Sequence, residues 1–331
     1  VRIRRWVRHH STLVTSVTTA ACVGLIVAGV SLGLLQSAYQ REQASHARVR
    51  HVVDDYFTQV SEATLLNQPG AQSLRRKLLE RAADHYEQFL RENGSETKAS
   101  LQVELGKAHF RLGVIRGSLD SPSRAMSDLD SAAAIQRHLV TDSPNTLERR
   151  YDLGMTLNAR GRLLHKQGRL NVAVKAFAEA LEVREHLVTM RPSDVEYVRT
   201  LANSHMNLGE TLRRQREYDR AVAEFGTAHA LRTTALEQSP NNTALLRDSA
   251  KGLYNLGNLH FERGHSVEAE KSLGAAVALF EQLRKESPAG LELLELTALA
   301  YRRLGDLQQL RQAFPEATAS YEHAVVAGRV L

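Results

Sequence analysis

The sequence is poor in residues that form covalent cross-links or large aromatic cores. It has one cysteine, Cys22, so no disulfide can form within the chain. Aromatic residues make up only 5% of the 331 residues, and the single tryptophan, Trp6, lies near the N-terminus. A folded core must therefore be built from aliphatic side chains and alanine, which is typical of packed helices.

Patterns that carry enzymatic chemistry are also missing. The 14 histidines are scattered, and His9 and His10 have no partners at metal-ligand spacing. No serine lies in a nucleophile elbow, and the glycines do not follow a phosphate-binding pattern. We therefore expect no catalytic, cofactor-binding or metal-binding residue in this chain, and no enzyme activity from it.

The positive charge is concentrated at the N-terminus, where no acidic residue precedes Glu42. Arg2, Arg4, Arg5 and Arg8 supply +4 of the formal net charge of +6, which leaves +2 for the rest of the chain. So small an excess argues against nucleic acid as a partner of the remaining residues.

A run of 24 uncharged residues follows, from Thr12 to Leu35. A helix of that length reaches roughly 36 Å, enough to cross a hydrocarbon core of about 30 Å. The sequence predicts a transmembrane helix at 12–35, with residues 1–11 as a basic cytoplasmic segment and everything after the span outside the cytoplasm, because positive charge favours the cytoplasmic side. The alternatives are a cleaved signal peptide and a buried core helix.

The predicted span contains a G-x-x-x-G pair, Gly29 and Gly33. Small residues at this spacing allow two membrane helices to approach closely. A homodimer formed through this face is therefore one possible assembly.

Residues 36–100 are predicted to be a helical linker followed by a degenerate first repeat or cap. Apolar residues recur at helical spacing from Ser37 to Val60, and the sequence Asn67–Gly70 then breaks the chain. Leu74–Leu90 forms a strongly amphipathic pattern that is out of register with the repeats that follow.

A 48-residue period governs residues 101–331 and predicts five copies of one unit. Each unit is expected to hold two helices of about 20 residues, separated from the next unit by a proline-containing break. No alternation typical of strands occurs, so the predicted fold is an all-α solenoid. The positions that recur are Gly113, Gly161, Gly209, Gly257 and Gly305; Ala125, Ala173, Ala221, Ala269 and Ala317; and Pro144, Pro192, Pro240 and Pro288.

A glycine inside each first helix needs a physical reason, because it costs about 1 kcal/mol relative to alanine. We attribute it to close backbone approach at a helix crossing. In the second helix, Ala221, Phe225 and Ala228 fall on one face, where two small residues flank a large one. The five glycines and five alanines are therefore predicted to be repeat-packing positions.

The string NLGETLRRQREYDRAVAEFGTAHAL, from Asn207 to Leu231, closely resembles the tetratricopeptide repeat. The same pattern returns from Asn255 to Leu279 and from Arg303 to Val325. This resemblance implies a right-handed solenoid of helix pairs that binds proteins or peptides. The usual tetratricopeptide period is about 34 residues, so both helices are extended here.

A second resemblance comes from the N-terminal part. This part contains RIRRWVRHH, the apolar run and LLNQPGAQSLRRKLLERAADHYEQFL, and long tetratricopeptide units follow it. In this order the segments resemble the C-terminal half of large bacterial eukaryotic-like serine/threonine protein kinases. In those proteins a cytoplasmic kinase domain precedes the membrane helix. This sequence lacks the glycine-rich, H-R-D and D-F-G motifs. Since it begins at Val1 rather than methionine, we interpret it as a fragment, and ATP and Mg²⁺ would be bound only by residues upstream of Val1.

The resemblance to tetratricopeptide proteins directs attention to the face of the first helices, where that family binds peptides. Polar residues recur there at a spacing of four, and we expect them to line a groove for a protein or peptide ligand without contributing to packing. They only partly resemble the family's carboxylate clamp, because an asparagine replaces the expected arginine at position 255. The predicted groove residues are Asn158, Arg162, Asn203, Asn207, Lys251 and Asn255.

The sequence thus favours a membrane-anchored binding scaffold, the docking or sensory tail of a kinase. The alternative is a stand-alone anchored or secreted assembly factor without a kinase.

Overall fold

The structure is a computed structural model that describes residues 71–95, 97–286 and 290–328. All of these residues lie in one compact unit. The predicted basic segment 1–11, the span 12–35 with Gly29 and Gly33, and the linker as far as residue 70 lie outside the described residues. Within those residues, no helix is long and apolar enough to cross a membrane.

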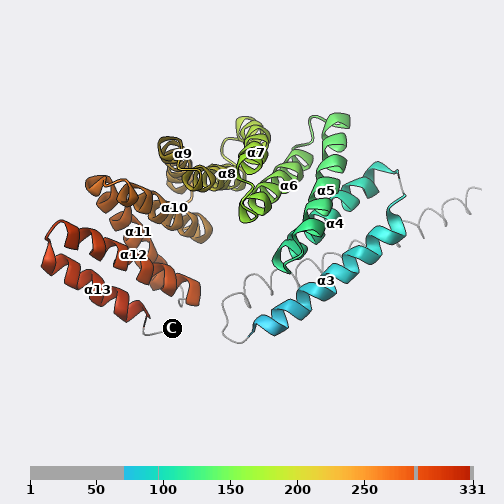
Figure 1. Ribbon diagram of the computed structural model, residues 1–331. Coiled ribbons are helices and arrows are strands. Elements are labelled where there is room, and N and C mark those ends of the chain that lie inside the picture. Colours follow the sequence, from blue (N-terminus) through green and yellow to red (C-terminus); the bar gives the residue numbers. More distant parts are fainter. Residues whose placement is uncertain (1–70, 96, 287–289, 329–331) are drawn as a thin grey trace, which may run out of the picture. The chain divides into compact units, whose positions relative to one another are not determined.

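The described residues form eleven helices and no strand (Figure 1), so the all-α prediction is confirmed for this part of the chain. A single helix, α3, comes first and five helix pairs follow. We call the first helix of each pair an A helix and the second a B helix. The helices are α3 (Gln72–Asn93); the A helices α4 (Ala99–Ser118), α6 (Leu147–Lys166), α8 (Val195–Arg214), α10 (Thr243–Glu262) and α12 (Leu291–Leu310); and the B helices α5 (Pro122–Asp142), α7 (Leu170–Met190), α9 (Tyr218–Gln238), α11 (Ser266–Glu286) and α13 (Phe314–Gly328).

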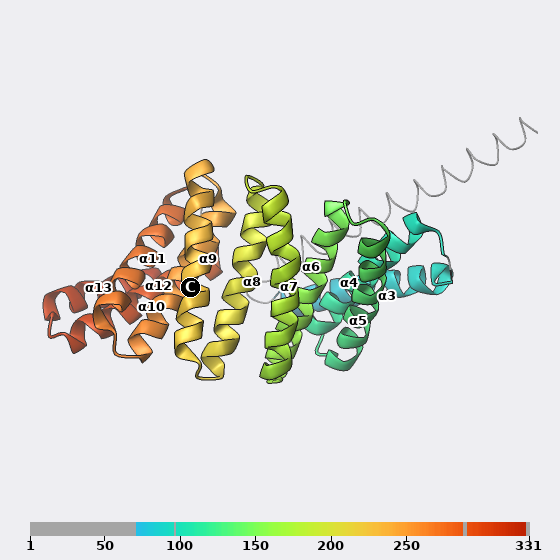
Figure 2. The ribbon, with the colours of Figure 1, turned by 90° about the horizontal axis from the view of Figure 1, so that it is seen from above.

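The helices pack in two layers. Each helix contacts the one before it and the one after it, and each A helix also contacts the next A helix. B helices make no comparable contact with one another in the described part of the chain. Consecutive repeats therefore meet mainly where the B helix of one repeat packs on the A helix of the next, with a smaller contact, here called a seam, between the two A helices (Figure 2).

The A and B helices of a pair cross at the repeated glycine. A Cβ atom on Gly161 would lie 2.5 Å from the Phe177 ring, and one on Gly209 would lie 2.6 Å from the Phe225 ring. Both distances are shorter than carbon atoms tolerate, so only glycine allows these helices to approach so closely. The same contact occurs in the other repeats between Gly113 and Leu129, Gly257 and Leu273, and Gly305 and Tyr321. The recurring alanines are buried as well, with Ala125, Ala173, Ala221 and Ala269 at 0% exposure and Ala317 at 3%.

Each A helix ends in the same tight turn. One residue there adopts the left-handed conformation, with φ of 64° at Arg216 and 74° at Gly168. In the third repeat the Glu217 amide donates to the Leu212 carbonyl at 3.0 Å, which is the long bond of a Schellman motif. Equivalent left-handed residues close the remaining turns at Asp120, Gly264 and Gln312.

Helix α3 covers the predicted helix Leu74–Leu90 and packs on α4. Its buried face includes Ala82, Tyr86 and Phe89. Arg116 of α4 forms ion pairs with Glu87 of α3 and Asp128 of α5. A half-buried charge network therefore joins α3 to the first repeat.

We predict that Gly209→Leu will lower the free energy of unfolding by about 1–3 kcal/mol, because the new side chain must enter the space of the Phe225 ring. The measurement is urea-induced unfolding followed by circular dichroism. Gly226 in α9 is the matched control, since a Cβ there would meet nothing within 4 Å. Gly226→Leu should raise the stability by up to about 1 kcal/mol through helix propensity, and equal effects of the two substitutions would contradict the crossing argument.

Candidate binding surfaces

The six residues predicted to line a groove lie on three consecutive A helices. Asn158 and Arg162 belong to α6, Asn203 and Asn207 to α8, and Lys251 and Asn255 to α10. Arg162 is exposed and the other five are partly buried. These positions therefore form a polar band on the A layer of the second, third and fourth repeats.

Several of these side chains link one repeat to the next. Asn207 Nδ2 donates to Asn158 Oδ1 at 3.0 Å, across the seam between α6 and α8. Lys251 of α10 forms an ion pair with Glu292 of α12. Asn203 Oδ1 accepts from Arg232 Nη2 at 2.7 Å. The expectation that these residues contribute nothing to packing is therefore wrong, because they fill hydrogen-bonding positions inside and between repeats.

The other two groove residues have no such role. No hydrogen bond or ion pair to the side chain of Arg162 or Asn255 is found among the described residues. Both side chains are therefore available to a partner on the A layer.

A chain of polar contacts runs along the same layer from α6 to α10. The Tyr151 hydroxyl donates to Glu196 at 3.0 Å, and burial, followed by the nearby charge of Glu196, raises the pKa of Tyr151 to about 12. Arg199 bonds Glu196 at 2.8 Å and reaches Asp248 of the next repeat at 3.2 Å. Asp248 also accepts from Asn203 at 3.5 Å. Tyrosine, carboxylates and arginine thus hold three A helices in register.

Beneath this chain lie two buried arginines that the sequence analysis did not identify. Arg184 of α7 and Arg232 of α9 occupy the same position in consecutive B helices and are 2% and 3% exposed. Burial lowers the pKa of each to about 10, so both guanidinium groups remain charged at neutral pH. Gln136 holds this position in the first repeat and is also buried, so a recurring polar residue among buried apolar neighbours was the available signal.

The two arginines differ in how their N–H groups are used. Arg184 Nη1 donates to the Thr200 carbonyl at 2.6 Å and to Ser204 Oγ at 2.7 Å, and Nη2 lies 3.2 Å from Met155 Sδ. Arg232 donates to Asn203 through Nη2, whereas its Nε and Nη1 are buried without an acceptor among the described residues. The second guanidinium therefore has unused hydrogen-bonding capacity.

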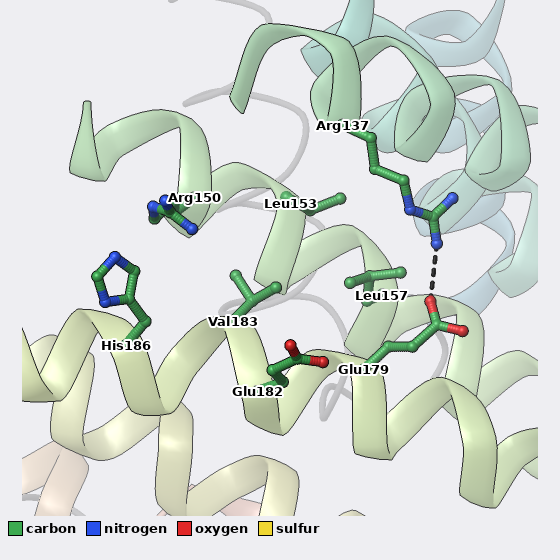
Figure 3. A pocket seen from close by; sticks show the side chains of 8 residues that line it. All are labelled: Arg137, Arg150, Leu153, Leu157, Glu179, Glu182, Val183 and His186. Atoms are coloured by element: carbon green, nitrogen blue, oxygen red, sulfur yellow. Dashed lines mark hydrogen bonds and ion pairs between the residues drawn. The ribbon is translucent and has the colours of Figure 1, made fainter. Parts of the chain in front are cut away.

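The opposite side of the array has a groove of about 400 Å³ between α5 and α7, floored by α6. Figure 3 shows Arg150 and His186 near each other at one end. At the other end Arg137 Nη2 and Glu179 Oε2 form an ion pair of 2.7 Å across the groove. Glu182, between them, has no ion-pair partner in the described part of the chain. The aliphatic side chains that line the groove are Leu153, Leu157 and Val183.

Similar grooves recur one and two repeats later, with volumes of about 350 and 520 Å³. They lie between α7 and α9 over α8, and between α9 and α11 over α10. In the last groove, Thr233, Ala275 and Ala278 occupy the positions that carry Arg137, Glu179 and Glu182 in the first. The shape is thus set by the fold, whereas the Arg137–Glu179 pair and Glu182 are particular to the first groove.

Neither surface contains a cluster of metal-ligating side chains. No group of three or more histidine, cysteine, aspartate or glutamate side chains that could hold a metal ion occurs among residues that the structure describes. The polar band and the grooves instead present amides, charges and aliphatic patches, which suit recognition of a peptide or protein surface.

We predict that Asn203→Ala will lower the free energy of unfolding by about 1–3 kcal/mol, because it removes the acceptor of the buried Arg232. Asn255→Ala, an asparagine change in the next A helix at the position equivalent to Asn207, should stay within about 0.5 kcal/mol. The added change Arg232→Met should recover part of the loss in a double-mutant cycle. Equal stability of the two asparagine variants would show that the Arg232–Asn203 bond contributes nothing.

Comparisons with known proteins agree with the repeat architecture. The tetratricopeptide repeat family model matches residues 153–188, which span most of α6 and α7. No curated protein matches the chain.

Solved structures resemble the array over most of its length. The crystal structure of BtubC (BKLC) from P. vanneervenii has a TM-score of 0.54 and 14% identity, covering 78% of this chain and 91% of that one. A putative kinesin light chain from Podosopora anserina with nearly identical TPR-like repeats has a TM-score of 0.51 and 16% identity, covering 69% and 96%. The apo form of RapI has a TM-score of 0.51 and 14% identity, covering 77% and 93%. At these identities the likeness concerns the fold alone.

The described part of this chain is therefore a tetratricopeptide-type helical repeat array, and its second unit matches the tetratricopeptide family itself.

Proposed function

We propose that this protein is a membrane-anchored scaffold that binds a protein or peptide segment on its A layer. The observation that carries the proposal is the polar band on α6, α8 and α10. Its fixed members, Asn158, Asn203 and Asn207, are held by hydrogen bonds within and between repeats. Arg162 and Asn255 stand beside them with unused donors and acceptors. Pre-ordered polar groups lose little conformational entropy when a partner binds.

The anchor in this proposal is the span 12–35, with residues 1–11 in the cytoplasm and the repeats outside it. The uncharged run and the preceding arginines support this topology. A homodimer held through Gly29 and Gly33 would place two arrays side by side and raise the effective concentration of binding sites.

The finer proposal is that the array is the docking or sensory tail of a bacterial serine/threonine protein kinase. It rests on the resemblance of the basic segment, apolar run and long repeats to such proteins. Catalysis, ATP and Mg²⁺ would then belong to a domain upstream of Val1. The alternative is a stand-alone anchored or secreted assembly factor, and sequencing the genomic region upstream of Val1 decides between them, since kinase motifs in the same reading frame are expected only for the first.

We predict that the double change Arg162→Ala and Asn255→Ala will weaken binding of the natural partner by at least about tenfold, the effect of one or two hydrogen bonds that involve charged groups. The experiment recovers proteins bound to the full chain from lysate of the source organism and then measures the affinity of the recovered partner for wild type and variant by titration calorimetry.

The control is the double variant Glu182→Ala and His186→Ala, which changes the groove between α5 and α7 on the opposite side of the array. This pair should leave the affinity unchanged. Loss of binding in the control with full binding by the A-layer variant would move the binding surface to the B-helix side and refute our assignment.

Topology gives a separate prediction. A reporter that fluoresces only in the cytoplasm should be bright when fused before Val1 and dark when fused after Leu331, because the arginines precede the apolar run. The opposite pattern would reverse the proposed orientation, and bright fluorescence from both fusions would exclude a single span.

A further inference from the structure

We propose that the groove between α5 and α7 docks one amphipathic helix of a partner protein, which places an acidic side chain against Arg150 and His186 and a basic side chain against Glu182. This surface lies on the B-helix side of the array. It is separate from the polar band on the A layer, and the inference does not rest on the function proposed above.

The argument begins with the charged side chains of the groove, which the repeat itself does not require. Three equivalent positions line both this groove and the next one along the array. They carry Arg150, Glu182 and His186 in the first groove, and Val198, Ala230 and Thr234 in the second. Because the second groove forms without these polar and charged side chains, the fold does not depend on them.

Arg150 stands where the following repeats bury an aliphatic side chain. At the equivalent positions Val198 is 7% exposed and Leu246 is 4% exposed. An arginine gives up that apolar contact, and here its Nε donates to the Pro144 carbonyl at 3.1 Å. No carboxylate pairs with Arg150 in the described part of the chain. Its Nη1 and Nη2 groups are therefore available to an anion.

The charges follow one another along the groove in a fixed order. Figure 3 shows Arg150 and His186 together at one end and Glu182 next to them toward the middle. The Arg137–Glu179 ion pair, already complete, lies at the other end. Glu182 and His186 are four residues apart on α7, which separates them by about 6 Å along the helix. The groove thus offers N–H donors to an anion at one end and a carboxylate to a cation one turn away.

The space between these charges is apolar. Leu153 and Leu157 of α6 form the floor and are 5% and 2% exposed, and the partly buried Val183 of α7 lies on the wall. The volume of about 400 Å³ is near the lower end of the range for ligand sites, about 300–1,000 Å³. The groove therefore accepts a few side chains, and an inserted aliphatic group would remove Val183 from water.

A helix suits this groove better than an extended segment. Walls and floor are helices, whose backbone N–H and C=O groups are bonded within each helix. They offer no partners to the backbone of an extended peptide, which would be left unsatisfied on burial. A helix satisfies its own backbone and presents side chains at i and i+4, the spacing of Glu182 and His186.

The order of the charges sets the direction of the docked helix. Both α5 and α7 run toward the end of the groove that holds Arg150 and His186. A helix whose dipole opposes theirs meets that end first and Glu182 one turn later. Its acidic residue is then at position i and its basic residue at i+4, which is also the order that stabilises an isolated helix.

The test uses the full chain in detergent and a set of amphipathic helical peptides that share one stripe of leucines. Beside the stripe, positions i and i+4 carry Glu, Gln or Lys in all combinations, and fluorescence anisotropy gives the affinities. We expect wild type to bind the peptide with Glu at i and Lys at i+4 most tightly, about fivefold or more above the reversed peptide of the same composition. Preference for the reversed order, or no preference, would contradict the proposal.

Glu182→Lys is the central variant, because this side chain is exposed and the change reverses one charge without altering the apolar floor. It should weaken the Glu–Lys peptide by about fivefold or more and make the peptide with Glu at both positions the preferred one. Arg150→Gln should remove the preference for Glu at i. Ala230→Lys is the matched control, since it adds the same charge at the equivalent position of the next groove, and it should leave every affinity unchanged.

The outcomes separate this inference from the function proposed for the A layer. The double variant Arg162→Ala and Asn255→Ala should bind the peptides as wild type does. Equal affinity of wild type and Glu182→Lys for the Glu–Lys peptide, or no binding of any peptide, would overturn the docking site and leave the A-layer proposal intact. Circular dichroism of each variant, recorded first, ensures that a lost affinity does not reflect a lost fold.

Discussion

The array depends on the close approach of glycine and a large side chain at each A–B crossing. Phe177 and Phe225 press on a helix backbone that carries no Cβ at that point, and buried alanines lie on either side of each ring. This contact fixes the distance and the register of the two helices in a pair. Each pair then packs on the next through its B helix, which leaves the grooves between consecutive B helices.

Beside the apolar packing of each B helix on the next A helix, a second system of contacts joins the pairs. It is polar, and it lies along the A layer, where Arg199 bridges to Asp248 and Asn207 bonds Asn158 across successive seams. Hydrogen bonds that involve charged groups contribute about 1.5–3 kcal/mol where they are well formed, similar to the burial of one large apolar side chain. The same side chains that hold repeats together thus form the surface that a partner would meet, so binding and inter-repeat stability are linked.

The sequence predicts the part of the structure that recurs. The same pattern of two helices, a close crossing and a break returns every 48 residues. A glycine such as Gly209 inside a helix is explained by the close crossing. The turns are less readable, because Asp120, Arg216 and Gln312 adopt a left-handed conformation usually associated with glycine. Backbone hydrogen bonding at the helix end selects that conformation, and residue type does not reveal it.

The polar contacts were the least predictable feature of the candidate site. Asn203 and Lys251 look like ordinary solvated residues in the sequence, and their partners lie in other helices. Arg184 and Arg232 would be assigned to a helix surface by residue type alone. Only three-dimensional packing shows that they pass between A helices, and that Arg184 Nη1 finds two acceptors where Arg232 Nη1 finds none among the described residues.

The separation of the B helices has a mechanical consequence. Because each B helix packs on the A helix that follows it and not on the next B helix, the A helix between them sets the width of the groove. The Arg137–Glu179 ion pair spans one such groove, but both side chains are about half exposed, so the pair adds little to holding α5 and α7 at that distance. A partner that inserts between two B helices would therefore have to displace surface side chains and would leave the crossings intact.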